Sequence, residues 1–341
     1  MTTPQAQGYS MPPEWAPHER CWMAWPCRAE TWGERMAAAR RTCAEIAQAI
    51  APFEPVTVIA RPELTAEASL RCGRGVSVVT LEHDDAWMRD LAPAFVFATD
   101  GALAGIDWRF DGYGGRLPGC EADARVAAAL CERLQIPRIE VPVVVEGGAI
   151  HIDGEGTCLA SAASLLDPAR NPGLGRGEME DSLRRYLGVE KVIWLEGVLA
   201  GDRAGGHVEQ VARFSAPGTV LALTAREADE ANHQALRDNV EHLKGERDAR
   251  GRELEVIEIE EPAPRQREDG RRIAASYLNF YLANGAVIMP MFDDSADRPA
   301  YRAIAAAFPD REMVEIEASD LVYGGGGIHS ITREQPARPG A

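Results

Sequence analysis

The sequence lacks a long apolar run, because nowhere do about eighteen apolar residues follow one another as a membrane-spanning helix requires. It also lacks an excess of basic residues: 36 Lys and Arg stand against 53 Asp and Glu, for a formal net charge of −17. Sequence-independent nucleic-acid binding needs clustered positive charge. Residues 1–13 contain neither a basic nor an apolar leader segment. We therefore expect a soluble, cytoplasmic protein with no nucleic-acid and no membrane partner.

Paired cysteines are missing as well. The seven cysteines are odd in number and none belongs to a Cys-x-x-Cys pair. Such thiols are typical of a reducing compartment and predict no disulfide framework. The composition is otherwise that of a folded protein, with 45% apolar and 26% charged residues, and 341 residues are enough to bury a large core.

What the sequence does contain is a recurring helix-then-strand pattern. Apolar residues at helical spacing are each followed by a β-branched run, and one or two strand-like runs precede each helix. This repetition predicts an α/β protein of radial or repeat architecture rather than an open sheet. No single unit could bury its own apolar face, so we expect residues 1–341 to form one domain. The five predicted helices cover residues 34–50, 120–134, 176–187, 227–243 and 299–308, and the strands after them cover 56–59, 139–145, 192–195, 254–259 and 313–316.

Three glycine-flanked histidines stand out among only seven histidines. His329 and Ser330 follow the run of four glycines from Gly324 to Gly327, His151 follows Gly147 and Gly148, and His207 follows Gly206. Glycine lets the backbone adopt positive φ and lets another group come close. A glycine-rich turn has a structural explanation when it occurs alone. Three of them predict one shared pocket.

Two kinds of chemistry fit these residues. His151 with Asp153, and His207 with Glu209, each place two potential metal ligands on one strand face, but zinc hydrolases usually need three ligands and no His-Glu-x-x-His motif is present. The favoured alternative is recognition of a planar cation. Two carboxylates can clamp the forked donors of a guanidinium while a nucleophile attacks its carbon and a histidine protonates the departing ammonia.

At these residues the chain resembles the agmatine deiminase family, which includes the bacterial-type peptidylarginine deiminases. The resemblance implies a five-bladed α/β propeller built from pseudo-fivefold ββαβ units, in agreement with the five helix-then-strand patterns. The matching stretches occur in the family's order along nearly the whole chain: 87–90, 110–115, 146–157, 170–173, 193–195, 206–207, 276–281 and 324–332.

The resemblance also implies residue roles. Asp90 would hold one side of the guanidinium, and Glu209 would supply the second clamping carboxylate. Glu146 would contact substrate nitrogens and orient His207, which would act first as general acid for ammonia and then as base for water. Position 330 would carry the nucleophile, a Cys in similar enzymes, and form a covalent thiouronium that water hydrolyses. No metal or organic cofactor would take part. Further substrate-binding residues would be Trp87, Arg203, Gly326 and Gly327.

The chain departs from the family pattern at several positions. Ser330 stands where the family has its nucleophilic Cys, which predicts a nearly inactive protein because a hydroxyl attacks less readily than a thiolate. It is either a deliberate Cys→Ser substitution or a natural, non-catalytic guanidine-binding pseudoenzyme. Glu209 replaces the usual Asp and Gln210 the usual Asn.

A last departure concerns the substrate. Residues 202–206 lack the acidic run of agmatine deiminases, and Ala162 and Ala163 stand where the family often has two Glu. The default substrate is agmatine, giving N-carbamoylputrescine and ammonia for polyamine and putrescine biosynthesis. Arginine, peptidyl-arginine, guanidino acids and alkylguanidines stay open as alternatives. Arg203 could meet a substrate carboxylate, or be a solvated loop arginine. The oligomeric state stays open too, with a homodimer as one arrangement.

Overall fold

A computed structural model describes residues 8–227 and 231–339. Its recurring unit is an antiparallel hairpin, then a helix, then a strand that returns parallel to the second hairpin strand. A parallel return requires a crossover, and the helix provides it while covering one face of the sheet. One such unit contains β4 (Ala94–Phe97), β5 (Leu103–Trp108), α6 (Val126–Leu134) and β6 (Arg138–Val141).

Three more units repeat this order along the chain. They consist of β7 (Ile150–Ile152), β8 (Thr157–Ser161), α8 (Arg176–Leu187) and β9 (Lys191–Leu195); of β10 (Ala212–Ala216), β11 (Thr219–Thr224), α9 (His233–Gly245) and β12 (Glu255–Glu260); and of β15 (Tyr281–Ala283), β16 (Ala286–Met291), α10 (Asp297–Ala307) and β17 (Glu312–Glu317).

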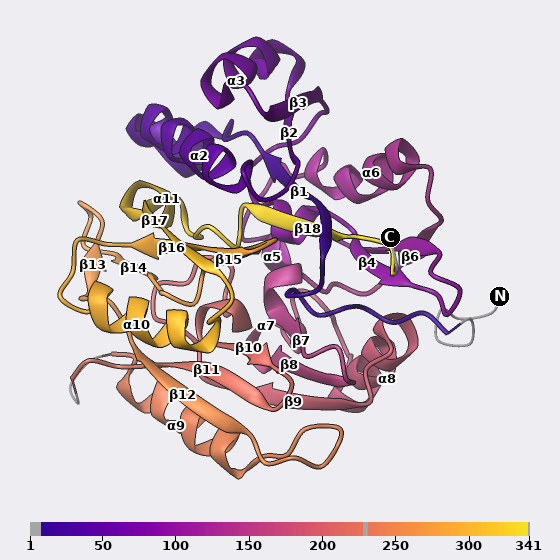
Figure 1. Ribbon diagram of the computed structural model, residues 1–341, viewed down its shortest axis with the longest axis vertical. Coiled ribbons are helices and arrows are strands. Elements are labelled where there is room, and N and C mark those ends of the chain that lie inside the picture. The colour runs from indigo at the N-terminus through magenta and orange to yellow at the C-terminus, as the bar shows by residue number, and fades with distance from the viewer. Residues whose placement is uncertain (1–7, 228–230, 340–341) are drawn as a thin grey trace.

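The remaining sheet joins the two ends of the chain. β18 (Thr332–Pro336) pairs antiparallel with β1 (His18–Ala24), so that Thr332 lies opposite Met23. α2 (Met36–Ile50) leads to β2 (Val56–Ala60), parallel to β1, and α3 (Thr65–Cys72) leads to β3 (Val76–Thr80) at the sheet edge. In Figure 1 these five sheets, each of three or more strands, follow one another around the centre of the view.

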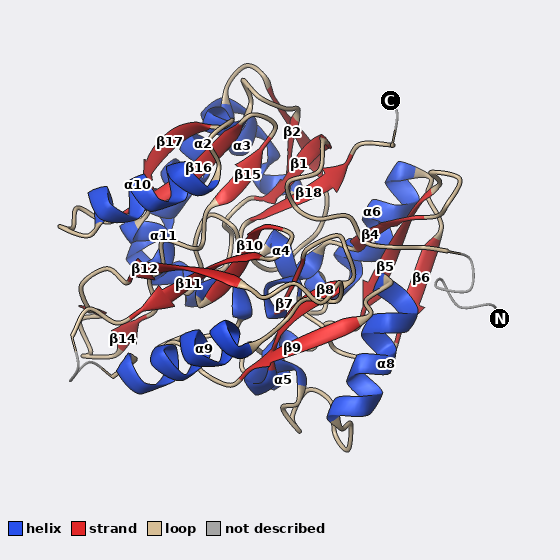
Figure 2. Cartoon of the chain, turned by 60° about the horizontal axis from the view of Figure 1, so that its bottom comes forward, coloured by secondary structure: helices blue, strands red, loops and turns tan. Residues whose placement is uncertain are grey.

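The central strands are apolar on both faces because each sheet has neighbours on both sides. Every residue of β2, β8 and β16 is buried. The helices are amphipathic: α10, for example, buries Ala300 and Ile304. Figure 2 shows α8, α9 and α10 toward the rim and β7, β8 and β10 nearer the centre. The strand ends that face the centre are thus brought close to one another.

Short elements occupy the connections near that centre. They are α1 (Ala29–Trp32), α4 (Met88–Leu91), α5 (Gly112–Gly115), α7 (Ala162–Leu165) and α11 (Ser319–Gly324). The hairpin of β13 (Arg265–Gln266) with β14 (Arg272–Ile273) lies toward the edge of the molecule in Figure 1. None of the helices in the described part of the chain is both long and apolar enough to cross a bilayer.

The predicted helix-then-strand pairs are all present, with corrections at their ends. The helix predicted over 227–243 begins at His233, and residues 228–230 of that prediction lie outside the described residues. The strand predicted over 139–145 ends at Val141, because the chain then turns toward Glu146 at the centre of the molecule.

Candidate active site

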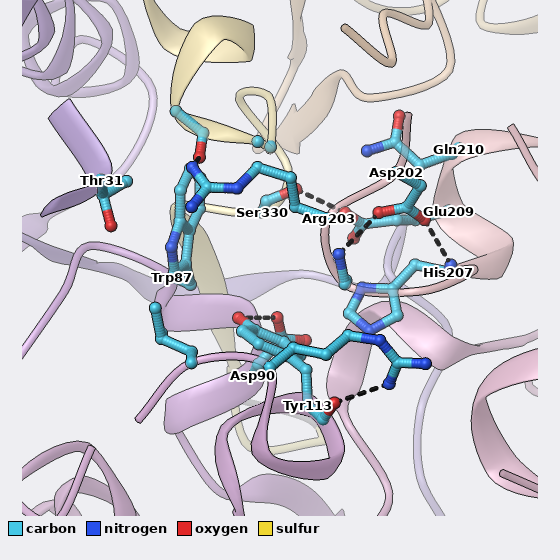
Figure 3. Close-up of a pocket in the computed structure, with 16 residues that line it drawn as sticks. Thr31, Trp87, Asp90, Tyr113, Asp202, Arg203, His207, Glu209, Gln210 and Ser330 are labelled. Atoms are coloured by element: carbon cyan, nitrogen blue, oxygen red, sulfur yellow. Dashed lines mark hydrogen bonds between the residues drawn. The ribbon is translucent and has the colours of Figure 1, made fainter. Parts of the chain in front are cut away.

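A cavity with an empty volume of about 510 Å³ opens where the connections of several units meet. Figure 3 shows side chains from the N-terminal, middle and C-terminal parts of the chain converging on it. Polar residues predominate in its lining, with Trp87, Tyr113 and Leu117 as the larger apolar surfaces. The other lining residues are Thr31, Asp90, Arg116, Asp202, Arg203, Ala204, His207, Glu209, Gln210, Gly324, Gly325, Gly326 and Ser330.

One wall of the cavity presents the carboxylate of Asp90, carried by α4. Its oxygens accept hydrogen bonds from Tyr113 Oη (3.0 Å) and from the backbone N–H of Gly148 (2.9 Å). Burial raises the pKa of Asp90 to about 6, with the negative charge of Glu209 adding to the rise and His207 opposing it. Asp90 therefore sits near its titration point at neutral pH.

The facing wall presents Glu209, from the turn after His207. Its Oε1 accepts hydrogen bonds from Ser330 Oγ and from Asn279 Nδ2 (3.0 Å), and its Oε2 pairs with the ring of His329. Burial would raise the pKa of Glu209, but the interactions with His329 and His207 and the hydrogen bond from Ser330 hold it far below its ordinary value. Glu209 stays ionised.

Ser330 occupies the turn that precedes β18. Its Oγ accepts a hydrogen bond from the N–H of Gly327 (3.3 Å) and contacts the side chain of Asn279. A Cβ on Gly326 would lie 2.6 Å from the Trp87 ring and 2.8 Å from the Cβ of Ser330, so only glycine fits there. Of the four consecutive glycines only Gly325 has positive φ, at 116°. The four glycines therefore mainly allow neighbouring side chains to come close to the backbone.

His207 lies between the two walls with Glu146 behind it. Burial disfavours the imidazolium, but Asp90 and Glu146 outweigh burial and raise the pKa of His207 to about 10. The His207 Nε2 is 3.9 Å from Glu146 Oε2. Glu146 also accepts from Arg170 Nε (2.6 Å) and Ser164 Oγ (2.9 Å). Burial raises the pKa of Glu146, but His207 and Arg170 outweigh it and lower that pKa to about 2. His207 is thus an imidazolium held by fixed negative charge.

The side chain of Asp202 orders the loop before His207 by binding its backbone N–H groups. Asp202 accepts hydrogen bonds from the N–H groups of Ala204, Gly206 and His207, at 2.8 to 3.0 Å. Arg203 is an exposed residue that lines the cavity, and its Nη1 donates to the carbonyl of Gly324 (2.7 Å). Arg203 is thus exposed to solvent and also anchored to the cavity wall, so both interpretations of this residue stay open.

The cavity brings together most of the predicted site residues, from three distant stretches of sequence: Trp87, Asp90, Arg203, His207, Glu209, Gly326 and Ser330. Glu146 lies behind His207, and Gly327 contributes its backbone N–H to Ser330.

The expectation that all three glycine-flanked histidines share one pocket needs correction, since only His207 lines the cavity. His329 lies behind Glu209. His151 is buried further away, its Nδ1 accepting from the N–H of Phe214. Asp153 accepts backbone hydrogen bonds within its own turn. Among residues 8–227 and 231–339, no group of three or more His, Cys, Asp or Glu is arranged to hold a metal ion.

Sequence reasoning assigned no role to Tyr113, Asn279 or Thr31. Tyr113 has positive φ (62°) between glycines, a strained conformation that orients its hydroxyl toward Asp90. Its signal was the unusual Gly-Tyr-Gly-Gly segment. Asn279 bonds both Glu209 and Ser330 yet has no local signal, because its place depends on the packing of two distant units.

Comparison with known proteins identifies the family. The family model described as Porphyromonas-type peptidyl-arginine deiminase matches residues 10–336. The chain belongs to this deiminase family. Agmatine deiminase from Stutzerimonas stutzeri is 39% identical over 360 residues, covering 98% of each chain. The solved agmatine deiminase of Enterococcus faecalis superposes with a TM-score of 0.96 at 33% identity, covering 99% of this chain and 98% of that one.

A second solved deiminase has its substrate bound. The C. jejuni agmatine deiminase, solved as a cysteine-to-serine variant with substrate bound, has a TM-score of 0.89 at 25% identity and covers 97% of both chains. The fold is therefore the mixed α/β pentein fold of the agmatine deiminases, and the relatives are hydrolases that act on C–N bonds.

Proposed function

We propose that this chain is a guanidine deiminase whose nucleophile position is occupied by Ser330. The main observation behind this proposal is that two carboxylates, half-buried Asp90 and buried Glu209, flank one cavity together with the His207 imidazolium and the Ser330 hydroxyl. Two facing carboxylates suit the forked donors of a guanidinium. The names of the relatives support the same chemistry. The five units would form the blades of a single-domain α/β propeller around this cavity.

With Cys at position 330, the reaction has two halves. The thiolate attacks the guanidinium carbon, the C–S bond forms, and His207 donates a proton as the C–N bond breaks and ammonia leaves. His207, now neutral, takes a proton from water, whose oxygen attacks the thiouronium carbon. The C–S bond then breaks as the remaining hydroxyl proton passes to solvent, which releases the ureido product and restores the thiolate. Asp90 and Glu209 hold the guanidinium through both halves, and Glu146 supplies the negative charge behind His207.

Ser330 makes the chain as written a binder with little turnover. Its hydroxyl donates to Glu209 and is far less ionised than a thiol at neutral pH, so it is a poor nucleophile. The substrate-bound Cys→Ser variant of the C. jejuni enzyme supports the idea that a serine form can retain its ligand. A deliberate substitution and a natural pseudoenzyme both predict this behaviour.

Agmatine is the first substrate candidate because it is the substrate named for the relatives. A guanidine with a carboxylate tail is the second, favoured by Arg203 in the cavity wall. Burial and the nearby Arg267 lower the pKa of Arg203, so an anion beside it would relieve an unfavourable positive field. The lining residue Arg116 adds a second cation.

The test is ammonia release by the Ser330→Cys protein with agmatine, arginine, a peptide ending in arginine, guanidinobutyrate and alkylguanidines. We expect a rate gain between about 10⁴-fold and about 10⁶-fold, the scale of nucleophile loss in covalent hydrolases. Arg203→Gln in the same background separates the substrate candidates: it lowers turnover of carboxylate-bearing guanidines and spares agmatine. No ammonia and no guanidine binding across the panel would refute the proposal, whereas binding without turnover would indicate the pseudoenzyme.

A further inference from the structure

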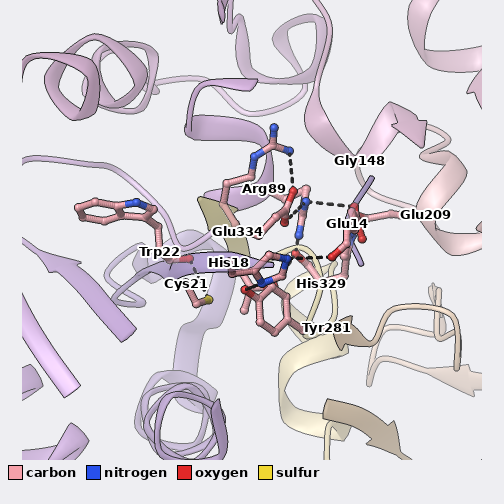
Figure 4. A network of polar contacts seen from close by, with 12 residues as sticks. Glu14, His18, Cys21, Trp22, Arg89, Gly148, Glu209, Tyr281, His329 and Glu334 are labelled. Carbon is pink, nitrogen blue, oxygen red and sulfur yellow. Dashed lines mark hydrogen bonds and ion pairs between the residues drawn. The ribbon is translucent and has the colours of Figure 1, made fainter. Parts of the chain in front are cut away.

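A second polar centre lies behind the cavity, around the buried carboxylate of Glu14. Four side chains from different parts of the fold reach it, and Figure 4 shows two of them, Arg89 and His329. Its Oε1 accepts from His329 Nε2 (2.8 Å) and Arg89 Nη1 (3.2 Å). Its Oε2 accepts from Arg213 and lies 3.4 Å from His151 Nε2. The N-terminal segment thus places one negative charge where four units meet.

His329 lies directly between two carboxylates. Its Nε2 faces Glu14 and its Nδ1 faces Glu209, and its ring is fully buried. An ionised carboxylate only accepts hydrogen bonds, so both ring nitrogens must donate. The ring in this geometry is the doubly protonated imidazolium. Its positive charge is shared by a carboxylate outside the cavity and a carboxylate in the cavity wall.

This arrangement fixes the orientation of Glu209. Its Oε2 is held by His329, which leaves Oε1 to meet Ser330 Oγ and Asn279. We propose that Glu14 is a positioning residue for this site: through the His329 imidazolium it holds Glu209 in the rotamer that faces position 330. The inference rests on the proposed function, because it concerns the carboxylate assigned to guanidinium binding.

The charge of Glu14, and not only its bulk, has this effect. The two arginines that contact Glu14 have other acceptors: Arg213 donates to the carbonyl of Leu278 (2.8 Å), and Arg89 pairs with Glu334 (2.7 Å). The His329 ring has only the two carboxylates as its ring partners in the described structure. A neutral residue at position 14 would remove the second carboxylate, so that Nε2 would no longer need an N–H. Glu209 would then face a single neutral Nδ1–H donor in place of a cation.

The first measurement needs no variant. Nitrogen-15 NMR of histidine-labelled protein, with His329 assigned by comparison with His329→Gln, distinguishes a ring with two N–H groups from a ring with one. We expect two N–H groups at neutral pH, and one N–H group in Glu14→Gln. A single N–H on His329 in the unaltered protein would overturn the proposal.

The second measurement is guanidine binding by calorimetry, with agmatine and arginine as probes. Glu14→Gln should raise the dissociation constant about 10-fold or more, the scale seen when a group that orients a liganding side chain is lost. Glu14→Asp, which keeps the charge, should recover part of the loss. The matched control is Glu54→Gln. Glu54 is equally buried and accepts from His18, Tyr281 (2.6 Å) and Asn284 (2.8 Å), away from Glu209.

The outcomes separate the two proposals. If the unaltered protein and Ser330→Cys neither bind nor hydrolyse guanidines, the proposed function fails, and the NMR signature alone decides the role of Glu14 toward His329. If the parent binds and Glu14→Gln weakens binding no more than Glu54→Gln does, Glu14 is a structural carboxylate and the positioning role is wrong. Melting curves of both variants ensure that folded protein is compared.

Discussion

The two carboxylates that face each other across the cavity, half-buried Asp90 and buried Glu209, are stabilised in opposite ways. Asp90 has only neutral hydrogen-bond donors, Tyr113 and Gly148, and its pKa is raised to about 6. Glu209 is backed by the His329 ring and its pKa lies far below the ordinary value. One wall therefore carries a permanent charge and the other an adjustable one. Burial destabilises the ionised form of both carboxylates, but only Glu209 has a buried cation, the His329 ring, in direct contact.

This difference separates the structural from the functional contribution of each wall. Glu209 belongs to the network that joins the units through His329 and Glu14, so its ionised form stabilises the fold. Burial and the negative charge of Glu209 both oppose ionisation of Asp90. The fold alone does not require an ionised carboxylate at this position. An ionised carboxylate without a cationic partner in the protein is expected at a site where a cationic ligand supplies that partner.

Glu209→Gln should have the largest effect on the free energy of unfolding. The change leaves the His329 ring without one of its two carboxylates, and breaking a buried ion pair costs about 3 to 5 kcal/mol. The measurement is urea unfolding at pH 7. A loss no larger than that of Asp90→Asn would mean that the two walls are equivalent and that the comparison is wrong.

Gly148→Ala should disturb both walls at once. A Cβ there would lie 2.4 Å from His207 Nδ1 and 3.0 Å from the carboxyl carbon of Glu209, while the Gly148 N–H bonds Asp90. Overpacking of this kind costs about 1 to 3 kcal/mol. Gly177→Ala in α8 is the control, because no atom lies within 4 Å of the added methyl group and alanine favours a helix. Equal melting temperatures for the two variants would argue against the close packing at Gly148.

The sequence predicts the fold far better than it predicts the polarity of these walls. The helix-then-strand units follow from periodicity, which is local. The pairing of Asn279 with Glu209, and the place of Glu14 beside His329, depend on residues more than sixty positions apart. The helix start at His233 was also missed, because apolar spacing alone does not mark where a helix begins. Glycine runs did locate the site, since close approach is a property of the residue itself.

Guanidine binding should depend on pH through Asp90 alone in the acidic range. As pH falls through about 6, Asp90 takes up a proton and loses its attraction for a cation, so the dissociation constant should rise about tenfold per pH unit below that point. Glu209 stays ionised and the His207 imidazolium persists up to about pH 10. Calorimetric titration of the Ser330 protein between pH 4 and about 8 checks this. A dissociation constant that does not change over this pH range would show that the ionisation of Asp90 does not control guanidine binding.

Asp90→Asn should give the smallest effect, and one of opposite sign to that of Glu209→Gln. The pKa of Asp90 is raised on folding, from 3.8 to about 6, so the folded state binds this proton more tightly than the unfolded state does. Folding stability therefore falls as pH rises through that window, and at pH 7 the ionised group is a net cost. Removing the charge stabilises the folded state, while weakening one hydrogen bond to Tyr113 or Gly148 destabilises it. The net effect should be a free energy of unfolding that is higher by about 1 kcal/mol. The gain should disappear below about pH 4, where Asp90 is protonated in both states. A variant that is less stable than the parent at pH 7 would show that the charge of Asp90, like that of Glu209, stabilises the fold. The sign of this small effect thus distinguishes a carboxylate that stabilises the fold from one that is kept for binding a ligand.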